Sequence, residues 1–379
     1  MTDTLRLKDR ELFWPPADEL TETAERIRAT LGDWPATQAP WRLCLTPPDA
    51  PNGGDLIIVT DAAPHLASIA RWMTEGAGVI EAKAGQPDNA GNVDKAQAAL
   101  VTLHLGGERY ALEGTLAEDW IPALAAFLDC GFDPHDALVL ALAWRDGDEQ
   151  KADAWPVDIA RFPRVLGLPD APARPFATCP QKLGLYPVLP TADWVERVLG
   201  FGVKTVQLRS KKTASPELTD EIERCVAAGR KHDAQLFIND HWQAAMAAGA
   251  YGVHLGQEDL READLNALAA SGIRLGLSTH GYFEMLTALH FRPSYIACGA
   301  VFATTTKEMP TAPQGMKRLK RYVQLLDGVV PMVAIGGIDG AVLPEVLTTG
   351  AGSAAVVRAV TEAADPAAAV AALRKAFTQ

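Results

Sequence analysis

The second half of the chain alternates short apolar runs with longer amphipathic segments. The segments between the runs, such as PELTDEIERCVAAGRKH, have the hydrophobic spacing of helices. Strands that alternate with helices predict βαβ units and a parallel sheet, and eight such units predict a closed (β/α)8 TIM barrel. The runs cover 185–189, 203–209, 234–240, 251–256, 273–278, 294–302, 330–337 and 353–357. An open doubly wound sheet is the alternative, but no G-x-G-x-x-G opens a helix after the first run.

The first part of the chain has a weaker pattern of the same kind. Strands are predicted at 55–61, 78–84 and 99–105, with a short edge hairpin at GGERYALEG. Residues 165–184 contain four prolines and no periodicity, which predicts a linker. We therefore expect a smaller α/β layer domain over 1–164, a linker over 165–184 and the barrel over 185–379. Helices are predicted at 17–31, 62–74, 117–129 and 134–145.

Composition narrows the function classes. The formal net charge of −12 disfavours a nucleic-acid binder, which usually presents a basic face. The five cysteines include no C-x-x-C pair, which predicts reduced thiols in a cytoplasmic protein. No apolar run approaches the ~20 residues that cross a membrane, and the charged N-terminal segment does not resemble a signal peptide. We expect small-molecule partners, with no nucleic acid and no membrane.

Polar side chains follow most of the apolar runs. In VQLRSK, strand alternation directs Gln207, Arg209 and Lys211 to one side, where they form a fork for phosphate oxygens. The alternative is a solvated loop with basic residues. Because active sites of parallel barrels lie at the carboxyl ends of the strands, we expect these residues to share one rim with those that follow the other runs.

Two acids follow neighbouring runs. Asp240 ends FIND and Asp259 lies in HLGQEDL, and each could be a helix cap or a metal ligand. Two carboxylates on adjacent strand ends suit Mg²⁺, which prefers few carboxylates together with water and phosphate oxygens. The pairing of the two acids favours the metal interpretation.

Hydroxyls and glycines follow the later runs. Ser278-Thr279-His280 closes the fifth run, and Thr304-Thr305-Thr306-Lys307 follows the sixth. AIGGID and AAVVRAV close the last two, where barrels commonly bind phosphate through backbone N–H groups. No acid and nucleophile complete a triad with His280, which disfavours a hydrolase.

From about Leu185 to the end, the sequence closely resembles the thiamine phosphate synthase family. VQLRSK, FIND, GVHLGQEDL, GLSTH, TTTK and VAIGGI occur in the family's order and spacing. The resemblance implies a transferase that condenses hydroxymethylpyrimidine diphosphate with a thiazole phosphate, giving thiamine phosphate and pyrophosphate.

The resemblance also implies residue roles. Gln207, Arg209, Lys211 and Asn239 would bind the pyrimidine diphosphate, and Asp240 and Asp259 would hold the cofactor Mg²⁺. Ser278 and Lys307 would contact the diphosphate, so that Arg209, Lys211, Ser278 and Lys307 form the catalytic set. Thr304, Thr306, Gly337 and the backbone near Val357 would bind the thiazole phosphate, with Arg358 where the family commonly has serine.

The stretch GTLAEDWIPALAAFLDCGFDPHDALVLALAW resembles the closing helices of hydroxymethylpyrimidine phosphate kinases. Those kinases place a G-T-G anion hole and a catalytic aspartate at the start of the first helix. Here the corresponding residues run from Glu113 to Asp119 without the second glycine. This resemblance implies a degenerate, inactive remnant.

Two other functions stay open from the sequence. A thiazole tautomerase would use His280 as its base and would handle no diphosphate. A non-catalytic thiamine-metabolite binding or regulatory protein would use the N-terminal domain as its effector. Asp259 and Lys307 disfavour the tautomerase, because that chemistry needs no metal-diphosphate clamp. The intact acids and Lys307 disfavour the binding protein.

Overall fold

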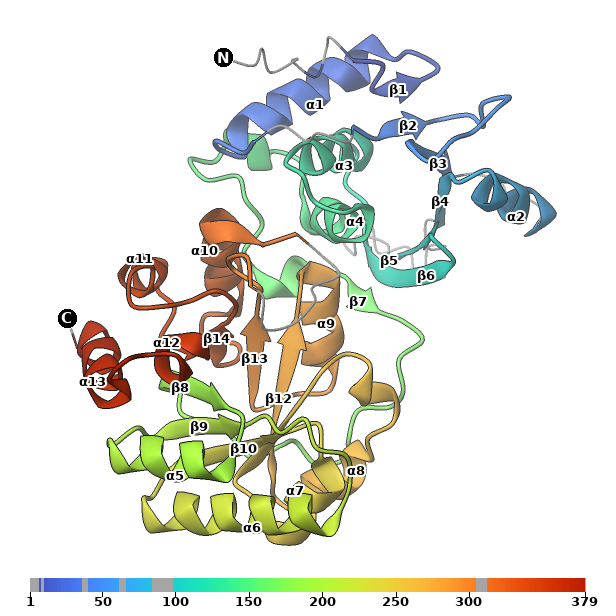
Figure 1. Cartoon of the computed structure of the whole chain (residues 1–379). Helices are drawn as coiled ribbons and strands as arrows, with labels where there is room; N and C mark the ends of the chain where they lie inside the picture. Colours follow the sequence, from blue (N-terminus) through green and yellow to red (C-terminus); the bar gives the residue numbers. More distant parts are fainter. Residues whose placement is uncertain are drawn as a thin grey trace. The chain divides into compact units, whose positions relative to one another are not determined.

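The computed structural model describes residues 7, 10–35, 40–60, 66–83, 98–304 and 312–378. The chain forms two compact units, Met1–Leu168 and Pro169–Gln379. Figure 1 labels their elements. Within the described residues, no helix is long and apolar enough to cross a membrane.

The first unit is a seven-stranded sheet in the order β1 to β7. Strands β1 to β4 run parallel to one another, and β5, β6 and β7 each run antiparallel to the preceding strand. The strands are β1 (Phe13–Trp14), β2 (Arg42–Cys44), β3 (Asp55–Val59), β4 (Gly78–Lys83), β5 (Ala98–Leu105), β6 (Glu108–Thr115) and β7 (Arg164–Val165). The predicted hairpin is present as β5 and β6, but its prediction as an edge was wrong, because β7 pairs with β6 beyond it.

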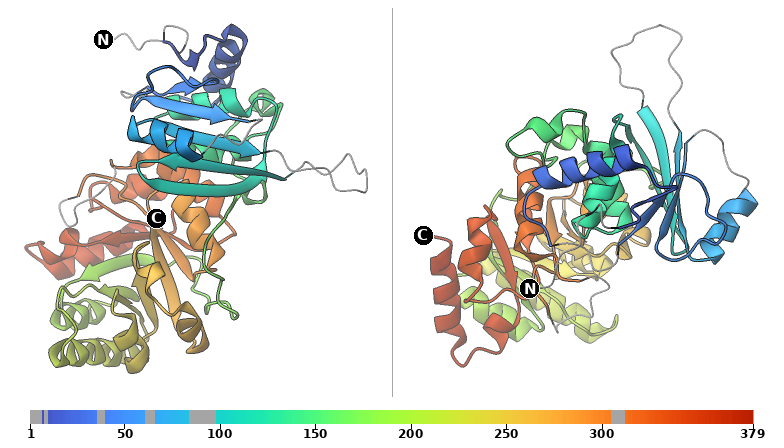
Figure 2. Two further views of the ribbon diagram at one scale, coloured as in Figure 1. Left: turned by 90° about the vertical axis from the view of Figure 1, so that its right-hand side faces the viewer. Right: turned by 90° about the horizontal axis from the view of Figure 1, so that it is seen from above.

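Helices cover both faces of this sheet. Figure 2 shows α2 (Leu66–Thr74) on one face and α1, α3 and α4 on the other. The helices of the second group are α1 (Asp18–Thr30), α3 (Trp120–Asp129) and α4 (Pro134–Ala143). Nearly every residue of α3 and α4 is buried, because α3 packs between α1 and α4 and α4 packs on β6. The apolar character of both helices all round their axes follows from this burial.

The second unit is a closed barrel of eight parallel strands, β8 to β15, in sequence order. The predicted fold class is therefore confirmed, with a (β/α)8 barrel after a smaller α/β layer domain. The strands are β8 (Gly184–Leu189), β9 (Thr205–Leu208), β10 (Gln235–Asn239), β11 (Gly252–Leu255), β12 (Arg274–Thr279), β13 (Tyr295–Cys298), β14 (Met332–Ala334) and β15 (Ser353–Val356). The helices are α5 (Ala192–Gly200), α6 (Pro216–Lys231), α7 (Trp242–Ala248), α8 (Leu265–Ala270), α9 (Tyr282–His290), α10 (Gly315–Leu326), α11 (Leu343–Thr348), α12 (Arg358–Thr361) and α13 (Pro366–Ala376).

The barrel interior is filled by side chains from alternate strand positions, as in other closed parallel barrels. Tyr186, Phe237 and Tyr295 are fully or almost fully buried there, together with smaller apolar residues. Gly276 provides the space for one ring, since a Cβ at that position would lie 2.2 Å from Cζ of Tyr295. Aromatic bulk in the interior therefore depends on glycine in the neighbouring strand.

The proline-rich segment before β8 lies along the barrel. The hydroxyl of Ser294 donates to the carbonyl of Ala177 at 2.6 Å, and Nε of Arg274 donates to the carbonyl of Thr178 at 2.9 Å. The amide of Ala173 donates to Oδ1 of Asn266 at 3.2 Å. These bonds explain why the compact unit begins at Pro169, ahead of the first barrel strand.

Candidate functional site

A pocket of about 670 Å³ lies at the carboxyl ends of β8, β9 and β15. Val188 and Leu189 contribute its apolar side, and basic residues from the other two strand ends complete it. Its lining consists of Val188, Leu189, Pro190, Arg209, Ser210, Lys211, Lys212, Val357, Arg358, Thr361 and Glu362. The structure thus brings Arg209, Lys211, Val357 and Arg358 of the predicted site together.

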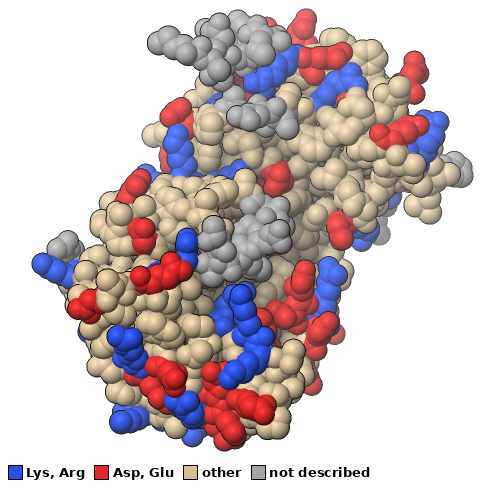
Figure 3. All heavy atoms as spheres, in the orientation of Figure 1, with Lys and Arg blue, Asp and Glu red and all other residues tan. Residues whose placement is uncertain are grey.

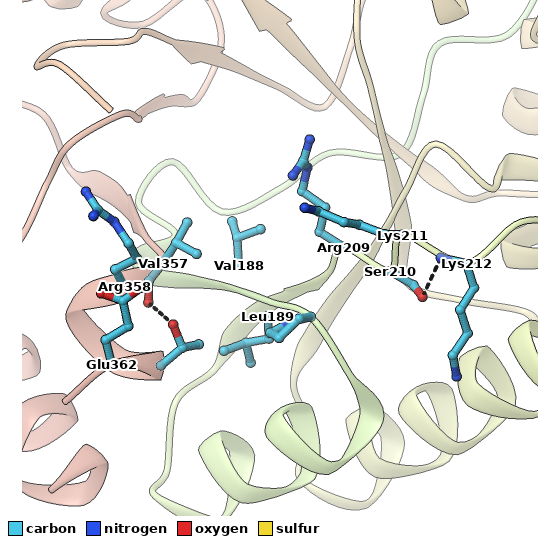
Figure 4. A pocket seen from close by; sticks show the side chains of 11 residues that line it. Val188, Leu189, Arg209, Ser210, Lys211, Lys212, Val357, Arg358 and Glu362 are labelled. Atoms are coloured by element: carbon cyan, nitrogen blue, oxygen red, sulfur yellow. Dashed lines mark hydrogen bonds between the residues drawn. The ribbon is translucent and has the colours of Figure 1, made fainter. Parts of the chain in front are cut away.

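The basic residues of the pocket differ in whether their side chains form an ion pair. Lys212 pairs with the buried Glu221 at 3.1 Å, and the hydroxyl of Ser210 donates to the same carboxylate. Figure 4 shows Lys212 pointing away from the side on which Arg209, Lys211 and Arg358 lie. Within the described part of the chain, the side chains of Arg209, Lys211 and Arg358 make no hydrogen bond or ion pair.

These three cations share a pocket with one acid, Glu362. Cations that are unpaired and only partly withdrawn from water attract anions, and arginine can bind two oxygens of one phosphate group. On the face drawn in Figure 3, acidic and basic side chains are interspersed, so the cations of the pocket form a local cluster rather than part of a basic surface. The pocket can therefore hold an anionic metabolite with more than one charged group.

Gln207 lies below the pocket, inside the barrel. Its side chain is buried, its Nε2 donates to the hydroxyl of Tyr186 at 3.2 Å, and its backbone is in register with Val188 of the pocket lining. Strand alternation places it on the same side as Arg209, but β9 ends at Leu208, so Arg209 and Lys211 belong to the loop beyond it. Gln207 therefore does not line the pocket and instead joins the polar residues of the barrel interior.

Asn239 is the last residue of β10, and Asp240 follows it. Asn239 is buried, and its amide makes no side-chain hydrogen bond within the described residues. Asp240 is exposed and adopts a left-handed conformation with φ of 62°, which aspartate and asparagine tolerate better than most residues. Its backbone amide donates to the carbonyl of His254 at 3.0 Å, which ties the end of β10 to β11.

Asp259 follows β11, the neighbouring strand. Its Oδ2 accepts from the amide of Gly256 at 2.8 Å, so the carboxylate closes the loop that leaves the strand. Asp240 and Asp259 thus leave the carboxyl ends of two paired strands. In the described ranges, no group of three or more His, Cys, Asp or Glu residues is arranged as a metal site. Two carboxylates nevertheless match the small protein ligand set that Mg²⁺ uses beside a phosphate substrate.

Ser278 lies near the end of β12 and is half-buried. Its Oγ lies 2.8 Å from Nε2 of His254. The neighbouring His280 uses Nδ1 to contact Glu284 at 2.8 Å, and its backbone amide donates to the same carboxylate. His280 is therefore engaged with the first turn of α9.

Thr304 and Gly337 come from adjacent loops. Val301 donates to the carbonyl of Ile335 and Phe302 donates to that of Gly336, so the segments after β13 and β14 are bonded to each other. Gly337 has φ of 67°, and a Cβ there would lie 2.7 Å from the carbonyl oxygen of Ala303. Glycine is thus required both by conformation and by space. Thr306 and Lys307 lie outside the described residues.

Sequence analysis missed the polar side chains inside the barrel. Tyr186, His254 and Tyr295 lie in strands whose sequence pattern is mostly apolar, and their hydroxyl and imidazole groups are bonded to one another or to Gln207 and Ser278. The available signal was alternation, because all three occupy inward-facing positions of short buried strands. Of the three, His254 in GVHLG gives the clearest sign of polar side chains inside the barrel.

The barrel unit resembles known proteins in sequence. A family model described as thiamine monophosphate synthase matches residues 185–360. A thiamine-phosphate synthase of Neisseria meningitidis is 61% identical over 157 residues, which are 41% of this chain and 76% of the relative. One from Citrobacter koseri is 53% identical over 170 residues, or 45% of this chain and 78% of the relative.

Among solved structures, the thiamine phosphate pyrophosphorylase from Pyrococcus furiosus is 31% identical, with a TM-score of 0.46. That match covers 52% of this chain and 96% of the other. The resemblance drawn from the sequence motifs is confirmed by the family model and by the curated relatives. The chain belongs to the thiamine-phosphate synthase family.

Proposed function

We propose that the barrel condenses hydroxymethylpyrimidine diphosphate with a thiazole phosphate and releases pyrophosphate and thiamine phosphate. The observation that carries this proposal is the pocket in which Arg209, Lys211 and Arg358 lie without partners among the described residues. Two phosphorylated substrates bring several negative charges to one site, and unpaired cations that follow β9 and β15, the two strands on either side of β8, can bind both.

The residues have distinct tasks in this reaction. The bond between the pyrimidine methylene carbon and the diphosphate oxygen breaks, and the leaving oxygen takes the electron pair. Arg209 and Lys211 neutralise the charge that develops on the diphosphate, an electrostatic contribution that often dominates enzymatic rate gains. The thiazole nitrogen then forms the new bond to the carbon, whose positive charge the aminopyrimidine ring delocalises. No side-chain nucleophile is needed.

The other predicted residues extend the site on either side. Asn239 offers an amide without a side-chain partner in the described chain, and Ser278 offers a hydroxyl near the end of β12. For the thiazole phosphate we propose Thr304, Gly337, Val357 and Arg358, with Thr306 completing the set. We also assign Lys307 to the diphosphate, as the family resemblance implies.

We further propose that Asp240 and Asp259 hold Mg²⁺. Their positions after the paired strands β10 and β11 support this assignment. When bound there, the ion would neutralise diphosphate oxygens. We place the reaction in the cytoplasm, in keeping with the free state of all five cysteines.

For the first unit we propose a non-catalytic, degenerate kinase-like role. The carboxylate of Asp146 accepts from the backbone amides of Glu118 at 3.3 Å and Asp119 at 3.4 Å, just before α3 begins. A protein carboxylate therefore occupies the amides that an anionic ligand would use at this helix start. Burial also raises the pKa of Asp119 to about 6.

The proposed reaction is tested by measuring pyrophosphate and thiamine phosphate after both substrates are mixed with the full chain and Mg²⁺. We expect equal amounts of the two products and none when either substrate is omitted. A tautomerase or a binding protein would release no pyrophosphate, and that outcome would exclude the proposal.

The metal assignment is tested by Asp240→Asn and Asp259→Asn. Asparagine is preferable to alanine at 240 because it tolerates the left-handed backbone while removing the charge. We expect each variant to lose on the order of 100-fold in turnover, the size of effect seen when one electrostatic contact to a transition state is removed. Asp220→Asn, at an exposed position of α6, is the control and should keep its turnover. Full activity in both variants would contradict the metal assignment.

A further inference from the structure

Five polar side chains form a continuous chain of hydrogen bonds across the barrel interior. Nε2 of Gln207 bonds to the hydroxyl of Tyr186 at 3.2 Å, and that hydroxyl lies 2.8 Å from the hydroxyl of Tyr295. The Tyr295 hydroxyl lies 2.7 Å from Nδ1 of His254, and Nε2 of His254 lies 2.8 Å from Oγ of Ser278. The chain thus links Gln207 of β9 to Ser278 of β12, which is one of the proposed substrate-binding residues.

The rings of this chain are held firmly in place. Tyr186 and Tyr295 are about 1% exposed or less, and His254 is 5% exposed. The Tyr295 ring fills the space that Gly276 leaves, packs edge-on against Phe237 and stacks on His254 with an interplanar angle of 22°. The imidazole therefore cannot turn without displacing buried aromatic side chains.

The direction of the chain follows from its donors. The amide nitrogen of Gln207 carries only hydrogens to donate, so the Tyr186 oxygen accepts and its own hydrogen is available to Tyr295. Tyr295 can then donate to Nδ1 of His254, an arrangement in which the imidazole proton lies on Nε2, facing Ser278. Burial raises the pKa of both phenols above the ordinary value, so each keeps the hydrogen that this direction requires.

We propose that His254 is a positioning residue for the condensation, held as the Nε2–H tautomer and donating to Oγ of Ser278. Because the serine oxygen accepts from His254, its own hydrogen is directed toward the site and can be donated to the diphosphate. In the opposite direction, Ser278 would spend its hydrogen on His254 and could offer only a lone pair to an anion. The inference rests on the proposed function, since it assigns a task to the Ser278 of that site.

Two substitutions separate the two ends of the imidazole. Glutamine at 254 has an amide N–H that can replace Nε2–H, whereas asparagine retains an oxygen near Nδ1 but does not reach Ser278. We expect His254→Asn to lower kcat on the order of 10-fold, the same as Ser278→Ala, with no further loss in the double variant. We expect His254→Gln to stay within roughly threefold of the unmodified chain. Equal losses in both variants, or additive losses in the double variant, would overturn the proposal.

The matched control is Ser294→Ala. Its hydroxyl is buried beside Tyr295 and bonded to the backbone of Ala177 and Leu275, outside the chain of five. This variant should unfold at lower temperature with kcat unchanged, whereas the His254 variants should differ in kcat at equal thermal stability. A purely structural role for His254 predicts that its kcat follows its stability.

The tautomer can also be measured without turnover. Nitrogen-15 NMR of histidine-labelled full chain distinguishes a protonated Nε2 from a protonated Nδ1, and we expect the hydrogen on Nε2. A hydrogen on Nδ1 would overturn the proposal whatever the activity. Wild-type kcat in Ser278→Ala would also overturn it while leaving pyrophosphate release intact, whereas absent pyrophosphate release from the unmodified chain would mark failure of the proposed function instead.

Discussion

Arginine serves opposite purposes in two regions of this chain, around Asp129 and Asp55 in the first unit and in the pocket of the barrel. In the first unit, Arg10 and Arg28 both pair with Asp129 at 2.8 Å, and Arg42 pairs with the buried Asp55 at 2.8 Å. In the barrel pocket, Arg209 and Arg358 have no such partner among the described residues. The same type of side chain is a structural tie in the first region and an available cation in the second.

The difference follows from the cost of burying charge. A buried carboxylate needs a cation and hydrogen bonds to offset its lost hydration, so the arginines around Asp129 are committed to the fold. A cation at a pocket mouth keeps much of its hydration and needs no internal partner. Available basic groups at a concave site therefore indicate function, whereas paired ones indicate stability.

The largest effect on the free energy of unfolding should come from removing Asp129, the acid that pairs with Arg10 and Arg28. Asp129 is 7% exposed and joins α3 to Arg28 of α1 and to Arg10. Asp129→Ala leaves two largely buried guanidinium groups without their acid, which we expect to lower the free energy of unfolding of the first unit by about 3 kcal/mol. Urea unfolding followed by tryptophan fluorescence measures the change.

The matched control is Glu113→Ala. Glu113 pairs with Arg164, whose side chain is 69% exposed, so solvent screens the interaction. We expect a loss below about 1 kcal/mol. Equal losses at Glu113 and Asp129 would contradict the distinction between structural ties and surface pairs.

Much of the barrel could be predicted because its strands are short apolar runs separated by amphipathic segments. The run predicted at 353–357 is strand Ser353–Val356, and the one at 185–189 is Gly184–Leu189. The cationic part of the site was also predictable, because Arg209 and Lys211 follow a strand and the carboxyl ends of parallel strands converge. Motif order supplied the remaining assignments.

Other features had no local signal. The bonds from Gln207 through Tyr295 to His254 join residues that are distant in sequence, and spacing along the chain does not encode such contacts. The edge position of the hairpin was predicted wrongly because β7 consists of two residues, Arg164 and Val165, too few to give a periodic pattern. Pairing of Glu113 with Arg164, 51 residues further along the chain, is decided by tertiary packing.

The second prediction tests whether Arg358 is an available cation. Arg358→Ser removes one of the three unpaired charges of the pocket while leaving Arg209 and Lys211 in place. We expect KM for the thiazole phosphate to rise on the order of 10-fold, the equivalent of about 1.4 kcal/mol of binding, with little change in KM for the pyrimidine diphosphate.

Steady-state kinetics with each substrate varied in turn measures this split. Arg374→Ser is the control, because that arginine bonds to the carbonyl of Phe201 and lies outside the pocket lining. An unchanged KM for the thiazole phosphate would remove Arg358 from the site and leave Arg209 and Lys211 as the anion-binding pair.

The smallest expected effect concerns Asp119, a buried acid of the first unit that is not paired as Asp129 is. Oδ1 of Asp119 is buried without a hydrogen-bond partner in the described structure. Burial raises the pKa of this carboxyl to about 6, and the neighbouring Asp146 adds to the rise, while Trp144 opposes it. An aspartate in an unfolded chain has a pKa of about 3.9.

Between these two values the folded chain binds more protons than the unfolded chain. The free energy of unfolding therefore falls as the pH rises from about 4 through 6, and the protonated carboxyl stabilises the fold only below that window. The side chain of Asp119→Asn stays neutral at every pH. Near pH 5 the free energy of unfolding of the variant should therefore be close to that of the unmodified chain. At pH 8 we expect the variant to be more stable by about 1 kcal/mol. Urea unfolding at both pH values measures the difference, with Glu22→Gln at an exposed position of α1 as the control. A stabilisation that is the same at both pH values would show that the carboxyl keeps its charge on folding, and Asp119 would then be a charged acid that, unlike Asp129 and Asp55, no cation pairs with in the described part of the first unit.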